Sequence, residues 1–195
     1  MKYQLRTKTY IIIAIINLLA VLSSPVYAMN LGTFYSLFLK NIPVIINTVF
    51  VTMLYAASVI LLFQESKQIQ KAGWILAIIP TAIILLNPLP SLSTNSYGFL
   101  IGTVQGLLAG DAITATLNIT ASIVPIIILI LAISMLAGCK SKKADKTITI
   151  ILAIAYVLTR FAEPAILVKS WPHYISPILT SAIFLTALLI WRKNK

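Results

Sequence analysis

Long apolar runs separated by short polar stretches make up most of this chain. Beyond the first 28 residues, five such runs cover residues 42–63, 72–89, 113–137, 147–168 and 174–191. Each is close to the roughly 20 residues that a helix needs to cross the hydrocarbon core of a bilayer. The apolar residues are continuous and do not alternate with polar ones, which favours helices over the strands of a membrane barrel. The pattern therefore predicts an all-α, polytopic helical membrane protein.

The first 28 residues have the layout of a secretory signal peptide. Three basic residues precede an apolar run over residues 10–22, and a Ser-Ser-Pro-Val-Tyr-Ala sequence then ends at Ala28, before a potential cleavage point. A retained first transmembrane helix has the same features, since the later runs also span the membrane. Two interpretations thus stay open for residues 1–28. Residues 29–195 are expected to form one helical membrane domain, with five or six spans in total.

Composition supports this class of protein. Hydrophobic residues make up 59% of the chain and charged residues only 10%. The polar stretches are too short to enclose a separate soluble core, so a single membrane domain is expected. The one cysteine, Cys139, cannot form a disulfide within the chain, and the fold therefore does not depend on oxidation.

The basic residues predict how the chain is oriented in the membrane. If the N-terminus is cytoplasmic, 12 of the 15 fall on the cytoplasmic side: Lys2, Arg6, Lys8, Lys67, Lys71, Lys140, Lys142, Lys143, Lys146, Arg192, Lys193 and Lys195. Only Lys40, Arg160 and Lys169 remain for the other side. This bias follows the positive-inside rule, so both termini are expected in the cytoplasm. The net charge of +11 is thereby explained without a nucleic-acid partner.

Glycines recur at every fourth position in one stretch of the chain. They are Gly98, Gly102, Gly106 and Gly110. In a helix over residues 97–110 they form a glycine stripe, along which a second helix can approach closely for packing or assembly. The stretch is too short to span comfortably, and a full crossing would export the lysine-rich residues 140–146. We therefore expect a re-entrant or interfacial helix on the outer side, closed by Asp111.

Arg160 and Glu163 form a candidate intramembrane ion pair. They lie three residues apart near the outer end of the run over residues 147–168, so one helical turn can bring their charges together. Ionisable residues at membrane depth are candidates for a functional site. The alternative is that Arg160 extends to the interface and has no functional role.

The sequence carries no recognisable catalytic motif. It has no phosphate-binding loop, nucleophile elbow, zinc-protease helix or dinucleotide fingerprint. The only histidine, His173, has no second metal ligand nearby, and its neighbours Trp171 and Tyr174 favour an interfacial anchor. We therefore expect no enzymatic activity, no catalytic residue, no cofactor and no metal, and the sequence identifies no small-molecule substrate.

Two stretches carry a resemblance to a bacterial family. The first is Leu39-Lys40-Asn41-Ile42-Pro43 leading through Tyr55 to Lys67, Lys71 and Gly73, and the second is Ile79-Pro80 running on to Ser91-Leu92-Ser93-Thr94 and Tyr97-Gly98. Over residues 39–138 the chain resembles the small inner-membrane subunits of type IVB secretion systems and related conjugation machines, of the intracellular-multiplication and organelle-trafficking kind. The resemblance implies a Gram-negative inner membrane and a non-enzymatic part in assembling an export channel.

The leading hypothesis is a structural or assembly subunit of a multiprotein inner-membrane complex. Its partners would be other membrane proteins or further copies of itself within the lipid bilayer, with close helix contacts at the glycine stripe. The rival hypothesis is a small transporter or channel component, in which the Arg160 and Glu163 pair and the proline-broken spans line a polar path.

Overall fold

The computed structural model describes residues 5–27, 42–86, 98–138, 142–167 and 170–193, and this part of the chain is helical without any strand. The elements in chain order are α1 (Leu5–Tyr27), α3 (Ile42–Leu62), α4 (Lys67–Leu86), α5 (Phe99–Leu108), α6 (Ala112–Leu136), α7 (Lys142–Ile166), the 3-10 turn η1 (Trp171–Tyr174) and α8 (Ile175–Lys193). The prediction of an all-α protein is confirmed for these residues.

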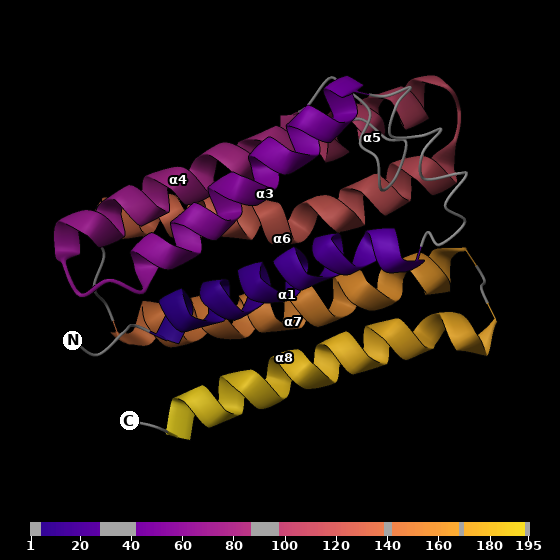
Figure 1. The fold of residues 1–195 in the computed structure, drawn as a ribbon. Helices are drawn as coiled ribbons and strands as arrows, with labels where there is room; N and C mark the ends of the chain where they lie inside the picture. The colour runs from indigo at the N-terminus through magenta and orange to yellow at the C-terminus, as the bar shows by residue number, and fades with distance from the viewer. Residues whose placement is uncertain (1–4, 28–41, 87–97, 139–141, 168–169, 194–195) are drawn as a thin grey trace.

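The long helices run side by side in alternating directions (Figure 1). Connections such as residues 63–66 between α3 and α4 are too short for any arrangement other than an antiparallel one. As a result α1 begins and α8 ends at the same end of the bundle (Figure 1), which we call the inner end after the predicted orientation. The outer end is where α7 ends and α8 begins.

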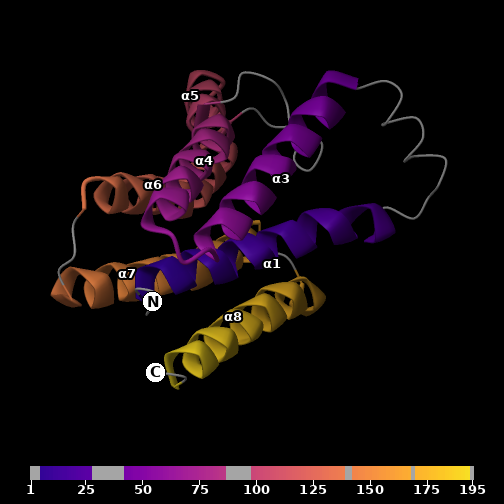
Figure 2. The ribbon, with the colours of Figure 1, turned by 60° about the vertical axis from the view of Figure 1, so that its left-hand side comes forward.

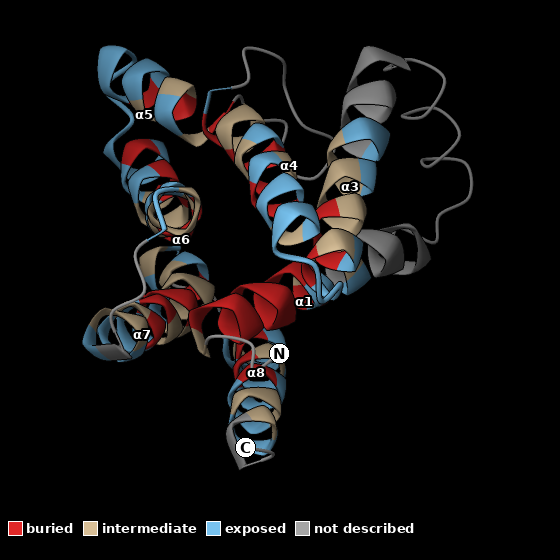
Figure 3. Ribbon diagram, turned by 90° about the vertical axis from the view of Figure 1, so that its left-hand side faces the viewer, coloured by how far each residue is buried: buried red, intermediate tan, exposed pale blue. Residues whose placement is uncertain are grey.

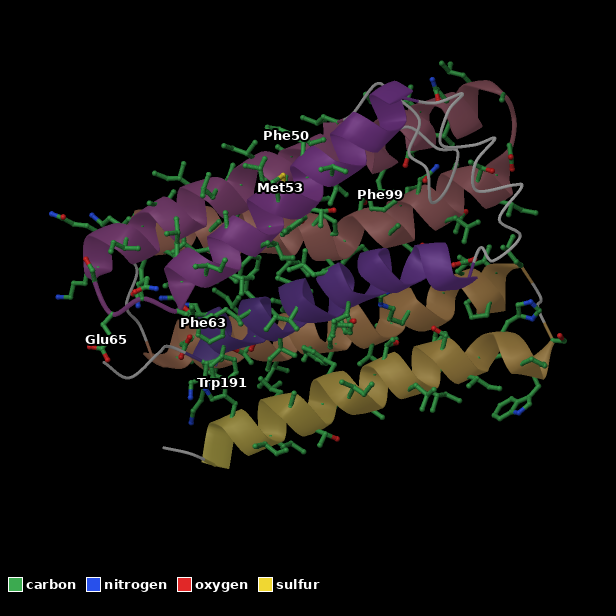
Figure 4. The ribbon with its side chains drawn as sticks, viewed as in Figure 1. Phe50, Met53, Phe63, Glu65, Phe99 and Trp191 are labelled. Carbon is green, nitrogen blue, oxygen red and sulfur yellow. The ribbon has the colours of Figure 1, made fainter. Side chains whose placement is uncertain are left out.

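Within the described ranges, four helices are long and apolar enough to cross a membrane: Lys67–Leu86, Ala112–Leu136, Lys143–Ile166 and Trp171–Trp191. They coincide with the predicted runs from residue 72 onward, although α4 and α7 begin several residues earlier, at lysines. The bundle also carries large apolar side chains on its outside, as contact with lipid requires. Phe50 and Met53 of α3 (Figure 4), for example, are 51% and 66% exposed.

The first half of α1 lies in the centre of the bundle. Residues 6–14 are buried without a break. Because a helix at an edge would expose one side, burial on every face requires neighbours all round. Those neighbours are α3, α7 and α8. Figure 2 shows α1 passing between α3 and α8, and Figure 3 shows its buried residues where the helices meet.

Asp145 of α7 fixes the start of α1. Its carboxylate oxygens accept the backbone N–H groups of Leu5 and Arg6, each at 3.0 Å. The first N–H groups of a helix have no partner within the helix, and the helix dipole favours a negative charge there. The same carboxylate lies 3.4 Å from Nε of Arg6, whose side chain is fully buried. One acidic residue thus caps α1 and balances the buried cation of Arg6.

Lys8 joins α1 to the end of α8. Its ammonium donates to the backbone carbonyl of Trp191 at 2.9 Å and lies 5.3 Å from the centre of the Trp191 ring. That ring in turn stacks on Phe63, with centroids 6.0 Å apart (Figure 4). A cation over an aromatic face and on a C-terminal carbonyl is favourable in both contacts. These residues tie α1, α8 and the end of α3 together at the inner end.

Hydroxyl groups make further contacts between helices inside the bundle. Tyr10 of α1 shares a hydrogen bond with Ser58 of α3 at 2.9 Å, and Tyr55 of α3 shares one with Thr81 of α4 at 3.2 Å. The ring of Tyr10 also lies 5.1 Å from that of Trp74 on α4. Each such bond contributes about 1 kcal/mol between membrane helices. These hydrogen bonds and the ring contact determine which faces of α1, α3 and α4 pack together.

Replacing Asp145 should loosen α1. Asp145→Ala is expected to lower the free energy of unfolding by about 3 kcal/mol, because it removes two capping acceptors and the countercharge of a buried guanidinium. The free energy of unfolding of Asp145→Asn should lie between those of this variant and the wild type, since its amide oxygen still accepts a backbone N–H group. The thermal unfolding midpoint of the purified protein in detergent measures the effect. Glu65→Gln, in the exposed turn between α3 and α4, is the control, and an unshifted midpoint for Asp145→Ala would contradict the prediction.

Candidate functional site

The glycine stripe lies in and around α5, and its middle faces α6 of the same chain. A Cβ atom at Gly102 would lie 2.8 Å from Nδ2 of Asn118, and one at Gly106 would lie 2.9 Å from the backbone nitrogen of Ala115. Since the later glycine meets the earlier residue of α6, the two helices form an antiparallel hairpin. At Gly106 glycine is needed because the two backbones approach more closely than a side chain allows, whereas Gly102 faces the side chain of Asn118.

The other two glycines of the stripe bound the helix. Gly98 is buried and precedes the first turn of α5. Gly110 has a φ of +70°, a left-handed conformation that turns the chain from α5 into α6 and that glycine adopts without strain. The stripe therefore serves a turn and a contact within the chain. The opposite face of α5 carries exposed apolar side chains, of which Leu108 is 84% exposed.

Asp111 closes the hairpin as the N-cap of α6. Its carboxylate accepts the hydroxyl of Thr114 at 2.6 Å and the backbone N–H of Thr114 at 3.0 Å. Both bonds favour the ionised form, and they lower the pKa of Asp111 below its ordinary value. The predicted position of Asp111, at the end of the glycine-rich stretch, thus coincides with the beginning of α6.

Alanine variants at Gly102 and Gly106 should differ in stability. Gly106→Ala places a methyl group against backbone atoms of α6 and should lower the free energy of unfolding by about 2 kcal/mol. Gly102→Ala meets only the end of the Asn118 side chain, which can rotate, and the gain of about 1 kcal/mol in helix propensity offsets the remaining strain. Thermal unfolding in detergent compares them. A Gly106→Ala variant as stable as Gly102→Ala would show that the backbones can separate at no cost.

A polar pocket lies at the outer end, between α7 and the start of α8. Its volume is about 250 Å³, and its walls are Thr159, Arg160, Glu163, Pro164, His173, Ser176 and Pro177. We call it the outer pocket. Both members of the candidate ion pair therefore line one cavity, on adjacent turns of α7.

Arg160 is held by two residues outside the candidate pair. Its guanidinium donates to Oδ1 of Asn17 on α1 at 2.6 Å and lies 5.0 Å from the ring centre of Tyr156. These contacts fix a half-buried cation between α1 and α7. An ion pair between Arg160 and Glu163 stays a prediction from their spacing.

His173 is exposed in the turn η1. Its Nδ1 lies 3.3 Å from the hydroxyl and 3.2 Å from the carbonyl oxygen of Ser170. Trp171 and Tyr174 on either side have stacked rings with centroids 6.3 Å apart. This aromatic turn has the character of an interfacial anchor. Across the described ranges no three residues of the kinds that bind metals come together.

Some residues of interest in the sequence fall where the structure gives no description. Cys139 and Lys169 are among them, and so is Lys40. Pro80, Pro125 and Pro164, by contrast, lie inside α4, α6 and α7.

Sequence reasoning misses the role of Asp145 altogether. The sequence uses Arg6 only to predict orientation, whereas the structure pairs Arg6 with Asp145. One signal was present: Asp145 is the only acidic residue in the lysine-rich stretch of residues 140–146. A lone carboxylate among lysines at a helix start is expected to have a specific partner. The sequence does not identify that partner, because the two residues are far apart along the chain.

No family model, curated protein or solved structure matches this chain. A function must therefore be inferred from the residues and contacts themselves. The resemblance of residues 39–138 to secretion-system subunits stays a prediction.

Proposed function

We propose that this chain is a non-enzymatic structural subunit of a multiprotein complex in a bacterial inner membrane, of the secretion or conjugation kind that residues 39–138 resemble. In this proposal α1, α3, α4, α6, α7 and α8 cross the membrane, and α5 re-enters from the outer side. Residues 1–28 are retained as the first span, and both termini are cytoplasmic.

One observation carries the proposal: polar side chains within the bundle bind to neighbouring helices. Arg6 is paired with Asp145, Tyr10 with Ser58, and Arg160 with Asn17. Each of these pairs joins α1 to another helix. A scaffold requires polar groups that fix helix positions, whereas a transport path requires polar groups that face water. The same contacts support retention of α1, because its removal would deprive Asp145 and Arg160 of these partners.

Retention and orientation are tested on one set of variants. In a Cys139→Ser background, Ser170→Cys should react with a membrane-impermeant maleimide in intact spheroplasts, and Lys143→Cys should react only after permeabilisation. Both positions are exposed, so a difference in labelling reports the side of the membrane. The intact mass of the purified protein should include residues 1–28. Labelling of Lys143→Cys from outside, or a mass lacking that segment, would contradict the proposal.

A second candidate, a small transporter or channel component, is favoured by a different observation. The hydroxyls of Thr149 and Tyr156 on α7 and of Ser181 on α8 are buried and have no hydrogen-bond partner in the described structure. A buried polar group without a partner costs about 1–3 kcal/mol, a cost that internal water would remove. Thr149 and Tyr156 lie on one face of α7, together with Asp145 near the inner end and Arg160 near the outer end.

Two measurements separate the candidates. A structural subunit extracted from native membranes in mild detergent should migrate within an assembly of fixed composition, and the purified chain should add no ion flux to liposomes. Tyr156→Phe removes the central hydroxyl of the α7 face and should leave the assembly unchanged. A chain that migrates alone and supports a flux that Tyr156→Phe abolishes would overturn the structural role and establish the second candidate.

A further inference from the structure

One side of α7 carries lysines at the inner end and apolar residues beyond them. Lys143, Lys146, Ile150 and Ile154 follow one another at intervals of three or four residues, so they share one side of the helix. All four are exposed, Ile150 and Ile154 to 57% and 55%. Leu152, on the opposite side, is fully buried in the bundle. We call the side formed by these two lysines and two isoleucines the lysine face of α7.

The lysine face crosses the boundary between lipid headgroups and hydrocarbon. The midpoint of the span Lys143–Ile166 lies beside Ile154. With that midpoint at the centre of the bilayer, Lys143 and Lys146 lie roughly 17 and 13 Å from the centre along the helix axis. Half of the hydrocarbon core is about 15 Å thick, so both ammonium groups reach the headgroups. Ile150 and Ile154 lie deeper, at the level of the acyl chains.

The lysine face keeps its positive charge. Residues 140–146 contain four lysines and one acidic residue, Asp145. The Asp145 carboxylate accepts two N–H groups at the start of α1 and lies 3.4 Å from Nε of Arg6, which balances its charge. Of the other three acidic residues in the chain, only Glu65 belongs to the inner end, in the turn between α3 and α4 (Figure 4). The lysines of residues 140–146 therefore favour an anion from outside the chain.

An anionic phospholipid matches both parts of the lysine face. Lysine ammonium groups bind phosphate as point charges, and clusters of basic residues beside a transmembrane helix are typical of sites for anionic lipids. The acyl chains of such a lipid would cover Ile150 and Ile154 directly below its headgroup. An acidic segment of a soluble protein would contact the lysines and leave the isoleucines uncovered. The lipid is therefore complementary to more of this surface.

We propose that the lysine face of α7 binds an anionic phospholipid, whose phosphate lies against Lys143 and Lys146. The lipid belongs to the inner leaflet, and this placement rests on the orientation in the proposed function. The binding itself goes beyond the structural role, because all the residues that form the site come from this chain.

Net charge distinguishes this lipid from zwitterionic ones. The phosphate of phosphatidylcholine is balanced by its own ammonium group, whereas the phosphate of phosphatidylglycerol is not. Each lysine at the membrane surface favours an anionic lipid by about fivefold, so Lys143 and Lys146 together favour phosphatidylglycerol by roughly 25-fold. Salt screens these charges, and the preference should fall as the ionic strength rises.

Lipid retention measured by native mass spectrometry tests the site. The purified protein is exchanged into phosphatidylcholine nanodiscs that contain a small fraction of phosphatidylglycerol with identical acyl chains. The wild type should retain phosphatidylglycerol with the preference given above. The double variant Lys143→Gln with Lys146→Gln should lose most of that preference. Lys143→Arg with Lys146→Arg preserves both charges and should keep it.

A matched pair of lysines lies at the start of α4. Lys67 and Lys71 are exposed and are followed on the same side of the helix by Ile75, which is 51% exposed. Glu65, two residues before Lys67, offsets part of their charge. Lys67→Gln with Lys71→Gln therefore makes the same change in net charge and should leave most of the preference intact. Thermal midpoints show whether each variant is folded.

Several results would overturn the lipid site. One is equal retention of the two lipids by the wild type, and another is an unchanged preference in a folded Lys143→Gln and Lys146→Gln protein. An equal loss in the α4 variant would show diffuse attraction in place of a site on α7. Loss of an assembly partner in the α7 variant, without any lipid preference in the wild type, would replace the lipid with an acidic protein.

The nanodisc measurement does not depend on which way the chain crosses the membrane, so the two proposals fail separately. Labelling of Lys143→Cys from outside the cell, together with the expected lipid preference, would overturn the proposed orientation and assign the lipid to the other leaflet. The expected labelling without a lipid preference would overturn the lipid site alone.

Discussion

The carboxylate of Asp145 at the start of α1 is the interaction on which the bundle depends. A buried guanidinium such as that of Arg6 is costly unless an anion lies close to it, and the first turn of a helix needs acceptors for its N–H groups. Asp145 meets both requirements with one side chain from another helix. Since α1 contacts α3, α7 and α8, a shift at its start would change its packing against all three helices.

Polar and apolar interactions have different roles in this bundle. Apolar packing has little directional preference in a membrane, because lipid tails are as apolar as leucine. Hydrogen bonds and close backbone contacts therefore determine which helix faces meet. Near the outer end Gly106 allows α5 to lie directly on α6, and near the inner end Lys8 joins α1 to α8. Between them, the Tyr10 and Ser58 hydroxyls align α1 with α3.

Much of the fold follows from the sequence, because continuous apolar runs and short polar connections leave few alternatives. Helices α3, α4, α6, α7 and α8 lie where the runs predict, and α5 falls within the stretch of regularly spaced glycines. The sequence could not indicate that α1 lies at the centre, since its apolar run is equally suited to a signal peptide. Nor could it pair residues as distant as Arg6 and Asp145, or Asn17 and Arg160. Spacing places Arg160 and Glu163 on neighbouring turns, and only the packing of α8 beside them creates the outer pocket.

The bond from Lys8 to Trp191 joins positions 183 residues apart, and this has a consequence for biogenesis. Because α8 follows α1 along the chain, this contact can form only after the five described helices between them have been synthesised. The centre of the described bundle is thus made before the helices that enclose it, and one side of α1 stays uncovered until α8 has been synthesised.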